Sequence, residues 1–154
     1  MHAGKIEVGV ERPQGPVQRV LYVEDEEDNF TVAELRLRKR YQLVWAKTDR
    51  QAVELLTASP RGYIAILMDI ELQGVALNGI QLTRLLRGGL PTHERPGFAA
   101  RLPIITAPII YVTAYGSRYG ERELLQTGAN AVIIKPVNFL ALSLAIATDA
   151  MRTP

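Results

Sequence analysis

The chain of 154 residues contains no cysteine and only two histidines. The absence of cysteine excludes a disulfide framework and a cysteine-ligated metal site, and it fits a reducing compartment. The chain also lacks a secretory signal and any apolar run long enough to span a membrane, so we expect a cytoplasmic protein without a membrane partner. Its formal net charge is only +2, which provides no broad electrostatic footprint for binding nucleic acid.

Short apolar runs alternate along the chain with amphipathic segments. The predicted strands cover residues 19–23, 42–46, 65–69, 109–112 and 131–134. The predicted helices cover residues 27–40, 49–58, 78–87, 117–127 and 139–151. Five strand–helix alternations predict an α/β domain with a doubly wound five-stranded parallel sheet and helices on both faces.

Two segments fall outside this alternation. Residues 1–18 are rich in glycine and proline and are expected to form a flexible leader, although Ile6, Val8 and Val10 alternate as in an edge strand. We place a single domain at residues 19–152. Within it, residues 88–108 form a proline-containing inserted loop, which we expect to be a surface excursion suited to docking.

Chemically useful side chains stand at the ends of four predicted strands: Glu24 and Asp25, Asp69, Thr113, and Lys135. In a parallel sheet these ends meet at one edge. Crowded carboxylates disfavour joint ionisation, and Mg²⁺ with oxygen ligands relieves that conflict. Lysine and threonine can bind phosphoryl oxygens. This set predicts a phosphoryl-transfer site in which an aspartate is the nucleophile.

The segments that carry these residues resemble the receiver domain of two-component response regulators. The matching motifs are Val-Leu-Tyr-Val-Glu-Asp at 20–25, Leu-Met-Asp-Ile at 67–70, Tyr-Val-Thr-Ala at 111–114, Gly-Ala at 128–129 and Ile-Ile-Lys-Pro at 133–136. The resemblance extends over residues 19–151, with all motifs in the family's order. It implies a flavodoxin-like fold with strand order 2-1-3-4-5.

The resemblance also implies roles for these residues. Asp69 would accept the phosphoryl group, and Mg²⁺ would be held by Asp25 and Asp69, by the backbone carbonyl of Glu71, and with help from Glu24. Lys135 would pair with the phosphoryl group and Thr113 would move toward it. The peptide bond between Lys135 and Pro136 would be cis.

Some positions differ from the family pattern. Val132 stands where the family usually has an aromatic residue whose rotamer follows the threonine, so that switch is expected to be absent or to use Tyr111 or Tyr115. Glu71 and Tyr115 flank the phosphoryl pocket and are expected to tune the lifetime of the phosphorylated state. Gln73 replaces the usual proline, and the glycines at 74 and 79 indicate a loop about two residues longer than usual.

The expected partners are other proteins. His93 lies among polar residues and prolines, which indicates a solvated loop residue, so the phosphodonor should be a histidine kinase or a histidine phosphotransfer protein. The output would be a contact with an unknown downstream protein. The last helix is apolar on nearly all sides, so we also expect a homodimer or partner interface there, formed by Phe139, Leu142 and Ile146; a segment folded over this helix is the alternative.

Two other functions remain open at this point. One is a receiver-fold docking module that acts without phosphorylation, which Val132 leaves open. The other is a small Mg²⁺-dependent phosphohydrolase with Asp69 as nucleophile and Glu71 as acid/base, although the chain has no evident substrate cap. We expect a signalling phosphoacceptor rather than an enzyme. The chain is either a stand-alone regulator or part of a larger protein.

Overall fold

A computed structural model describes residues 17–73, 75–114 and 119–152. The described part of the chain contains the strands β1 (Arg19–Val23), β2 (Gln42–Ala46), β3 (Ala65–Met68), β4 (Ile109–Thr113) and β5 (Ala131–Ile134). All neighbouring strands pair in parallel, in the order β2-β1-β3-β4-β5. The flavodoxin-like architecture predicted from the sequence is therefore confirmed.

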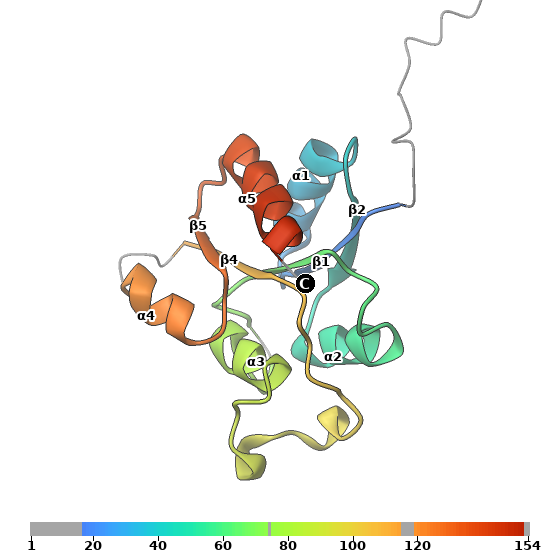
Figure 1. Cartoon of the computed structure of the whole chain (residues 1–154), viewed down its shortest axis with the longest axis vertical. Coiled ribbons are helices and arrows are strands. Elements are labelled where there is room, and N and C mark those ends of the chain that lie inside the picture. The colour runs from blue at the N-terminus through green and yellow to red at the C-terminus, as the bar shows by residue number, and fades with distance from the viewer. Residues whose placement is uncertain (1–16, 74, 115–118, 153–154) are drawn as a thin grey trace, which may run out of the picture.

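Helices cover both faces of this sheet. They are α1 (Glu27–Leu37), α2 (Asp49–Ala58), α3 (Gly79–Leu86), α4 (Glu121–Gln126) and α5 (Phe139–Arg152). Figure 1 shows α1 and α5 on one side of the sheet and α2, α3 and α4 on the other. Because strand side chains alternate between faces, Val20 and Tyr22 pack in the α1–α5 layer, whereas Leu21 and Val23 pack in the α2–α3 layer.

Polar side chains cap the starts of three of the helices. The hydroxyl of Thr48 accepts a hydrogen bond from the backbone N–H of Gln51, at 3.1 Å. Asn78 and Gln81 form a reciprocal capping box at the start of α3. The side chain of Asn138 accepts from the backbone N–H of Ala141, at 3.0 Å. These caps satisfy backbone donors that have no partner inside a helix.

Two predicted helices differ from the observed ones by more than one residue at an end. The first ends at Leu37 rather than at residue 40, because residues 38–40 form a turn in which Arg40 donates its backbone N–H to the carbonyl of Leu37, and the chain then enters β2. The fourth begins at Glu121, and residues 115–118, where its predicted start lies, fall outside the described residues. The edge strand suggested at residues 6–10 also falls outside them.

The inserted loop contains two short 3-10 helices, Thr92–Glu94 and Gly97–Ala99, and it runs back past α2 (yellow in Figure 1). Residues 91–95 are exposed, whereas Leu90, Ile105 and Ala107 are buried in the α2–α3 core, and Phe98, Ala99 and Leu102 pack partly buried against it. The segment is therefore a surface excursion only in part, and its role in docking stays a prediction. Its two ends carry apolar side chains that extend the core.

The three residues predicted to form an interface on α5 do not lie on its exposed face. Leu142 and Ile146 are 1% and 0% exposed, and Phe139 packs against the same core. The helical period turns these three side chains toward the sheet, whereas Leu140 and Leu144 point outward and are 72% and 57% exposed. Within the described residues, no helix has both the length and the apolar character that a membrane span needs.

Candidate functional site

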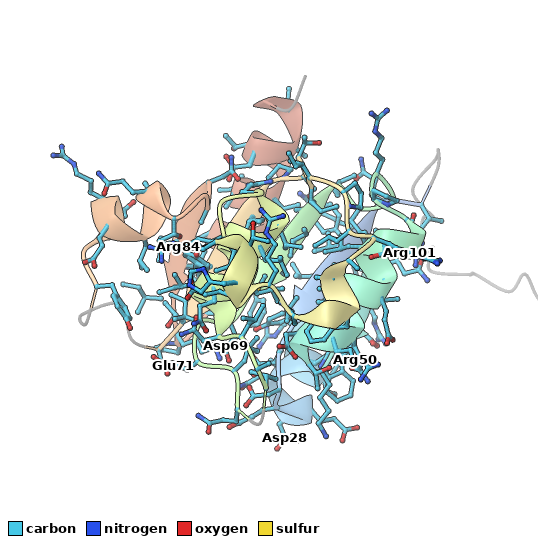
Figure 2. All side chains as sticks on the ribbon, turned by 90° about the horizontal axis from the view of Figure 1, so that it is seen from below. Asp28, Arg50, Asp69, Glu71, Arg84 and Arg101 are labelled. Atoms are coloured by element: carbon cyan, nitrogen blue, oxygen red, sulfur yellow. The ribbon has the colours of Figure 1, made fainter. Side chains whose placement is uncertain are left out.

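Three carboxylates converge at the carboxyl edge of the sheet. Backbone pairing continues one residue past β1 and β3, because the N–H groups of Glu24 and Asp69 donate to the carbonyls of Ala46 and Val23, both at 3.0 Å. Carboxylate oxygens of Glu24, Asp25 and Asp69 all lie within 4.8 Å of one another. Figure 2 shows Asp69 beside Glu71 in the lower part of the view, on the side where Asp28 also lies.

Lys135 brings a positive charge to this cluster from the end of β5. Its Nζ lies 3.2 Å from Oε2 of Glu24 and 3.7 Å from Oδ2 of Asp69. Its backbone N–H donates to the carbonyl of Thr113 at 2.8 Å, which continues the β4–β5 pairing to the lysine. The Lys135–Pro136 peptide bond is cis. One ammonium thus faces three carboxylates, so the cluster keeps a net negative charge.

The electrostatics of Asp69 reflect that imbalance. The residue is only 5% exposed, and burial together with the charge of Glu24 raises its pKa from 3.8 to about 7. The ammonium of Lys135 and a hydrogen bond from the backbone N–H of Glu71, at 3.1 Å, act in the opposite direction. Another cation at this place would favour the ionised, nucleophilic form of Asp69.

The donor set suits a hard divalent cation. It consists of carboxylate oxygens from Glu24, Asp25 and Asp69, and Mg²⁺ prefers such oxygens together with water and phosphate oxygens. Asp25 is half-buried, and its Oδ2 accepts a hydrogen bond from the backbone N–H of Gln73 at 3.1 Å. The residues present therefore fit Mg²⁺. The backbone carbonyl of Glu71 as a further ligand stays a prediction.

The loop after Asp69 is held by contacts that the sequence did not suggest. The carboxylate of Asp49, at the start of α2, accepts a hydrogen bond from the backbone N–H of Leu77 at 2.9 Å. Gly79 donates its N–H to the carbonyl of Ile70, also at 2.9 Å. A Cβ on Gly79 would lie 2.1 Å from the carbonyl oxygen of Asp69, so only glycine allows this closure.

Thr113 ends β4 and is fully buried beside the cluster, where its register partner is Ile134. Two residues earlier, the buried Tyr111 is the register partner of Val132. The Tyr111 hydroxyl lies 2.5 Å from Oγ1 of Thr127, at the end of α4. The buried aromatic side chain of this pair thus comes from β4, whereas its partner on β5 is a valine. Tyr115 lies outside the described residues.

Tyr22 and Asn29 also belong to the site, although the sequence did not suggest them. The Tyr22 hydroxyl donates to Oε2 of Glu24 at 3.2 Å, and the Asn29 amide donates to Oε1 at 3.3 Å. Burial and the charge of Glu24 raise the pKa of Tyr22 far above its ordinary value, so its hydroxyl stays protonated. The period of two along β1 could have indicated Tyr22, because residues two apart share one face of the sheet.

The sequence comparisons identify the family. Residues 20–147 match the response regulator receiver domain. The chain belongs to this family. Over 125 residues it is 30% identical to the autoinducer 2 sensor kinase/phosphatase LuxQ of Vibrio parahaemolyticus, an alignment that covers 80% of this chain and 13% of LuxQ. The chain thus spans a small part of that relative's length.

Solved receiver domains have the same fold. The receiver domain of the sensor histidine kinase PA1611 from Pseudomonas aeruginosa is 29% identical, with a TM-score of 0.68 over 88% of this chain and 99% of that one. That structure has a magnesium ion coordinated in its active-site cleft. The receiver domain of Francisella response regulator 1452 is 20% identical, with a TM-score of 0.70 over 89% and 99% of the two chains.

Proposed function

We propose that this receiver domain accepts a phosphoryl group on Asp69 from the phosphohistidine of a histidine kinase or a histidine phosphotransfer protein. The observation that carries the proposal is the placement of Asp69. Its buried carboxylate lies beside two other carboxylates and within 3.7 Å of the Lys135 ammonium. With a pKa of about 7 the carboxyl is only partly ionised near neutral pH, so a bound cation would raise the fraction in the ionised, reactive form.

In the transfer, an Oδ atom of Asp69 attacks the phosphorus of the phosphohistidine. The bond from phosphorus to the imidazole nitrogen breaks, and the nitrogen keeps the electron pair and takes a proton. Lys135 orients and partly neutralises the phosphoryl oxygens, and Thr113 donates its hydroxyl to one of them. Bound Mg²⁺, held by Asp25 and Asp69 with Glu24 and the carbonyl of Glu71, supplies positive charge for the carboxylates and the phosphoryl group.

The signal is a changed protein contact. Phosphorylation adds a charge of about −2 at the edge of the sheet, which draws Thr113 and Lys135 inward and repacks the neighbouring α4 face. Glu71 and Tyr115 tune how long the phosphoryl group persists. LuxQ and PA1611 are sensor kinases. That supports a place for this chain in a cytoplasmic phosphorelay, where it works on proteins and not on nucleic acid or membranes.

The test is the intact mass of the protein after incubation with Mg²⁺ and acetyl phosphate, with Asp69→Asn as the control. We expect a phosphoryl adduct on the parent, none on the control, and none on the parent when a chelator removes Mg²⁺. An adduct that persists in Asp69→Asn would place the acceptor elsewhere. A parent that forms no adduct with acetyl phosphate or a phosphorylated histidine phosphotransfer domain would favour a phosphorylation-independent docking module.

A further inference from the structure

Glu24 is the most completely enclosed acidic side chain of the candidate site, with no exposed surface. Four donors point at its carboxylate. Oε2 accepts from the Tyr22 hydroxyl and from Nζ of Lys135, both at 3.2 Å. Oε1 accepts from the backbone N–H of Glu26 at 3.2 Å and from the Asn29 amide at 3.3 Å.

These four hydrogen bonds occupy all the acceptor sites of the Glu24 carboxylate. An ionised carboxyl group has two oxygens and about four lone-pair sites. Each Glu24 oxygen receives two donors, so a metal ion could bind Glu24 directly only by displacing one of them. Asp25 and Asp69 are different, because among the described residues each has one carboxylate oxygen that accepts a backbone N–H and another that does not.

Three of the four donors come from the same local unit as Glu24. Tyr22 lies two residues earlier on β1, the Glu26 N–H lies at the start of α1, and Asn29 lies in its first turn. Lys135 alone comes from a distant part of the chain. The β1–α1 unit therefore sets the direction of the Glu24 carboxylate, and it turns Oε2 toward Lys135.

We propose that Tyr22 is a positioning residue, which holds the Glu24 carboxylate toward Lys135 and competes with Mg²⁺ for its lone pairs, so that direct coordination falls to Asp25 and Asp69. This inference rests on the proposed function insofar as the acidic cluster is taken to be a Mg²⁺ site. A receiver with this tyrosine binds Mg²⁺ more weakly than the same site without the hydroxyl. It therefore needs a higher Mg²⁺ concentration to become ready for phosphorylation.

The alternative is that Tyr22 only fills space. Its ring does pack against Phe30, with the ring centroids 6.3 Å apart. Tyr22→Phe separates the two roles, because it keeps the ring and removes only the hydroxyl. Tyr41→Phe is the matched control. Tyr41 is a buried tyrosine of the same apolar layer, and it lies just before the amino end of β2, whereas the site lies at the carboxyl ends of the strands.

The experiment is calorimetric titration of the full chain with Mg²⁺, without any phosphodonor, backed by the rise in Tm that Mg²⁺ produces. We expect Tyr22→Phe to lower the Kd for Mg²⁺ roughly 10- to 100-fold, as for the loss of one competing hydrogen bond to a charged group. Tyr41→Phe should keep the Kd of the parent. Asn29→Ala should lower it by less, because Asn29 is half-exposed and water can replace its amide.

A second arm repeats Tyr22→Phe in a Glu24→Gln background. There the change in Kd should vanish, because the hydroxyl acts only through the carboxylate. An unchanged or higher Kd in Tyr22→Phe overturns the proposal, and so does an equal change in the Glu24→Gln background. If neither the parent nor Tyr22→Phe binds Mg²⁺, the proposal is also overturned. Phosphorylation is measured separately by intact mass, so the proposed function can fail while this inference stands.

Discussion

The indole nitrogen of Trp45 lies 2.6 Å from the main-chain carbonyl oxygen of Glu24, to which it donates a hydrogen bond. Trp45 is the only tryptophan of the chain and stacks on Phe30, with ring centroids 5.2 Å apart. The edge strand β2 is thereby connected to the residue that begins the acidic cluster. Any change in the Glu24 backbone alters the surroundings of a single fluorophore.

We therefore expect tryptophan emission to report occupancy of the site. Titration with Mg²⁺ should change the emission intensity and saturate at the midpoint found by calorimetry, and acetyl phosphate should cause a further change. In Asp25→Asn the Mg²⁺-dependent change should shift to higher concentration, because a ligand has been lost. Calorimetric binding of Mg²⁺ with constant emission would contradict the prediction.

Lys135→Met should slow the formation of the acetyl phosphate adduct roughly 100- to 1,000-fold, the effect of losing one donor to transition-state charge. Mg²⁺ binding should tighten rather than weaken, because Glu24 and Asp69 lose the ammonium that partly neutralises them. Rapid-quench mass spectrometry gives the rate, and Lys39→Met, which removes an exposed lysine beyond the end of α1, is the control. Equal rates in the two variants would remove Lys135 from the transfer step.

The raised pKa of Asp69 makes the stability of the metal-free protein depend on pH. Its pKa is about 7 in the fold against 3.8 ordinarily, so between these values the folded state retains a proton that the unfolded state releases. This stabilisation is complete below pH 3.8 and is lost as the pH rises through 7. At pH 8 without Mg²⁺, Asp69→Asn should therefore raise the free energy of unfolding by roughly 1 to 3 kcal/mol.

Urea unfolding at a series of pH values measures this difference. It should shrink toward zero as the pH falls below 3.8, where Asp69 becomes protonated in both states, and it should also shrink when Mg²⁺ is added at pH 8. The exposed Asp28 provides the control variant Asp28→Asn, which removes one negative charge away from the cluster. A stability gain from Asp69→Asn that does not vary with pH would indicate a packing effect instead.

Gly79→Ala should destabilise the fold by about 2 to 4 kcal/mol, because its Cβ would meet backbone atoms that cannot move aside freely. That Cβ would lie 2.1 Å from the carbonyl oxygen of Asp69 and 2.7 Å from Cα of Ile70. Adduct formation should slow as well, since the acceptor backbone must shift. Gly97→Ala is a matched control, because its Cβ meets nothing within 4 Å. Equal unfolding free energies for the two variants would contradict the prediction.

Much of the fold could be predicted because the sheet is buried on both faces. The strands β1, β2 and β5 have the boundaries expected from their apolar runs. The approach of Glu24, Asp25 and Asp69 also follows from the sequence, since parallel strands end at one edge. Local patterns of apolar and polar residues indicate the type of each element and the ends of the strands, so these can be predicted without knowing which distant residues are in contact.

Other features depend on contacts between distant residues. The pattern of α5 is apolar on nearly all sides, so only packing against the sheet shows that Leu142 faces inward and Leu144 outward. The inserted loop has no periodicity, and its burial depends on the apolar core against which Leu90 and Ile105 pack.

The sequence by itself determined the order of strands and helices and the set of chemical groups at the strand ends, because those follow from local periodicity and from the geometry of a parallel sheet. The tertiary structure decided which donors surround each carboxylate. The carboxylate of Glu24 accepts hydrogen bonds from Tyr22 and Lys135. The carboxylate of Asp49 accepts one from the backbone N–H of Leu77, in the loop after Asp69. Such pairings depend on side-chain reach and direction to within a few tenths of an ångström, which a linear pattern does not encode.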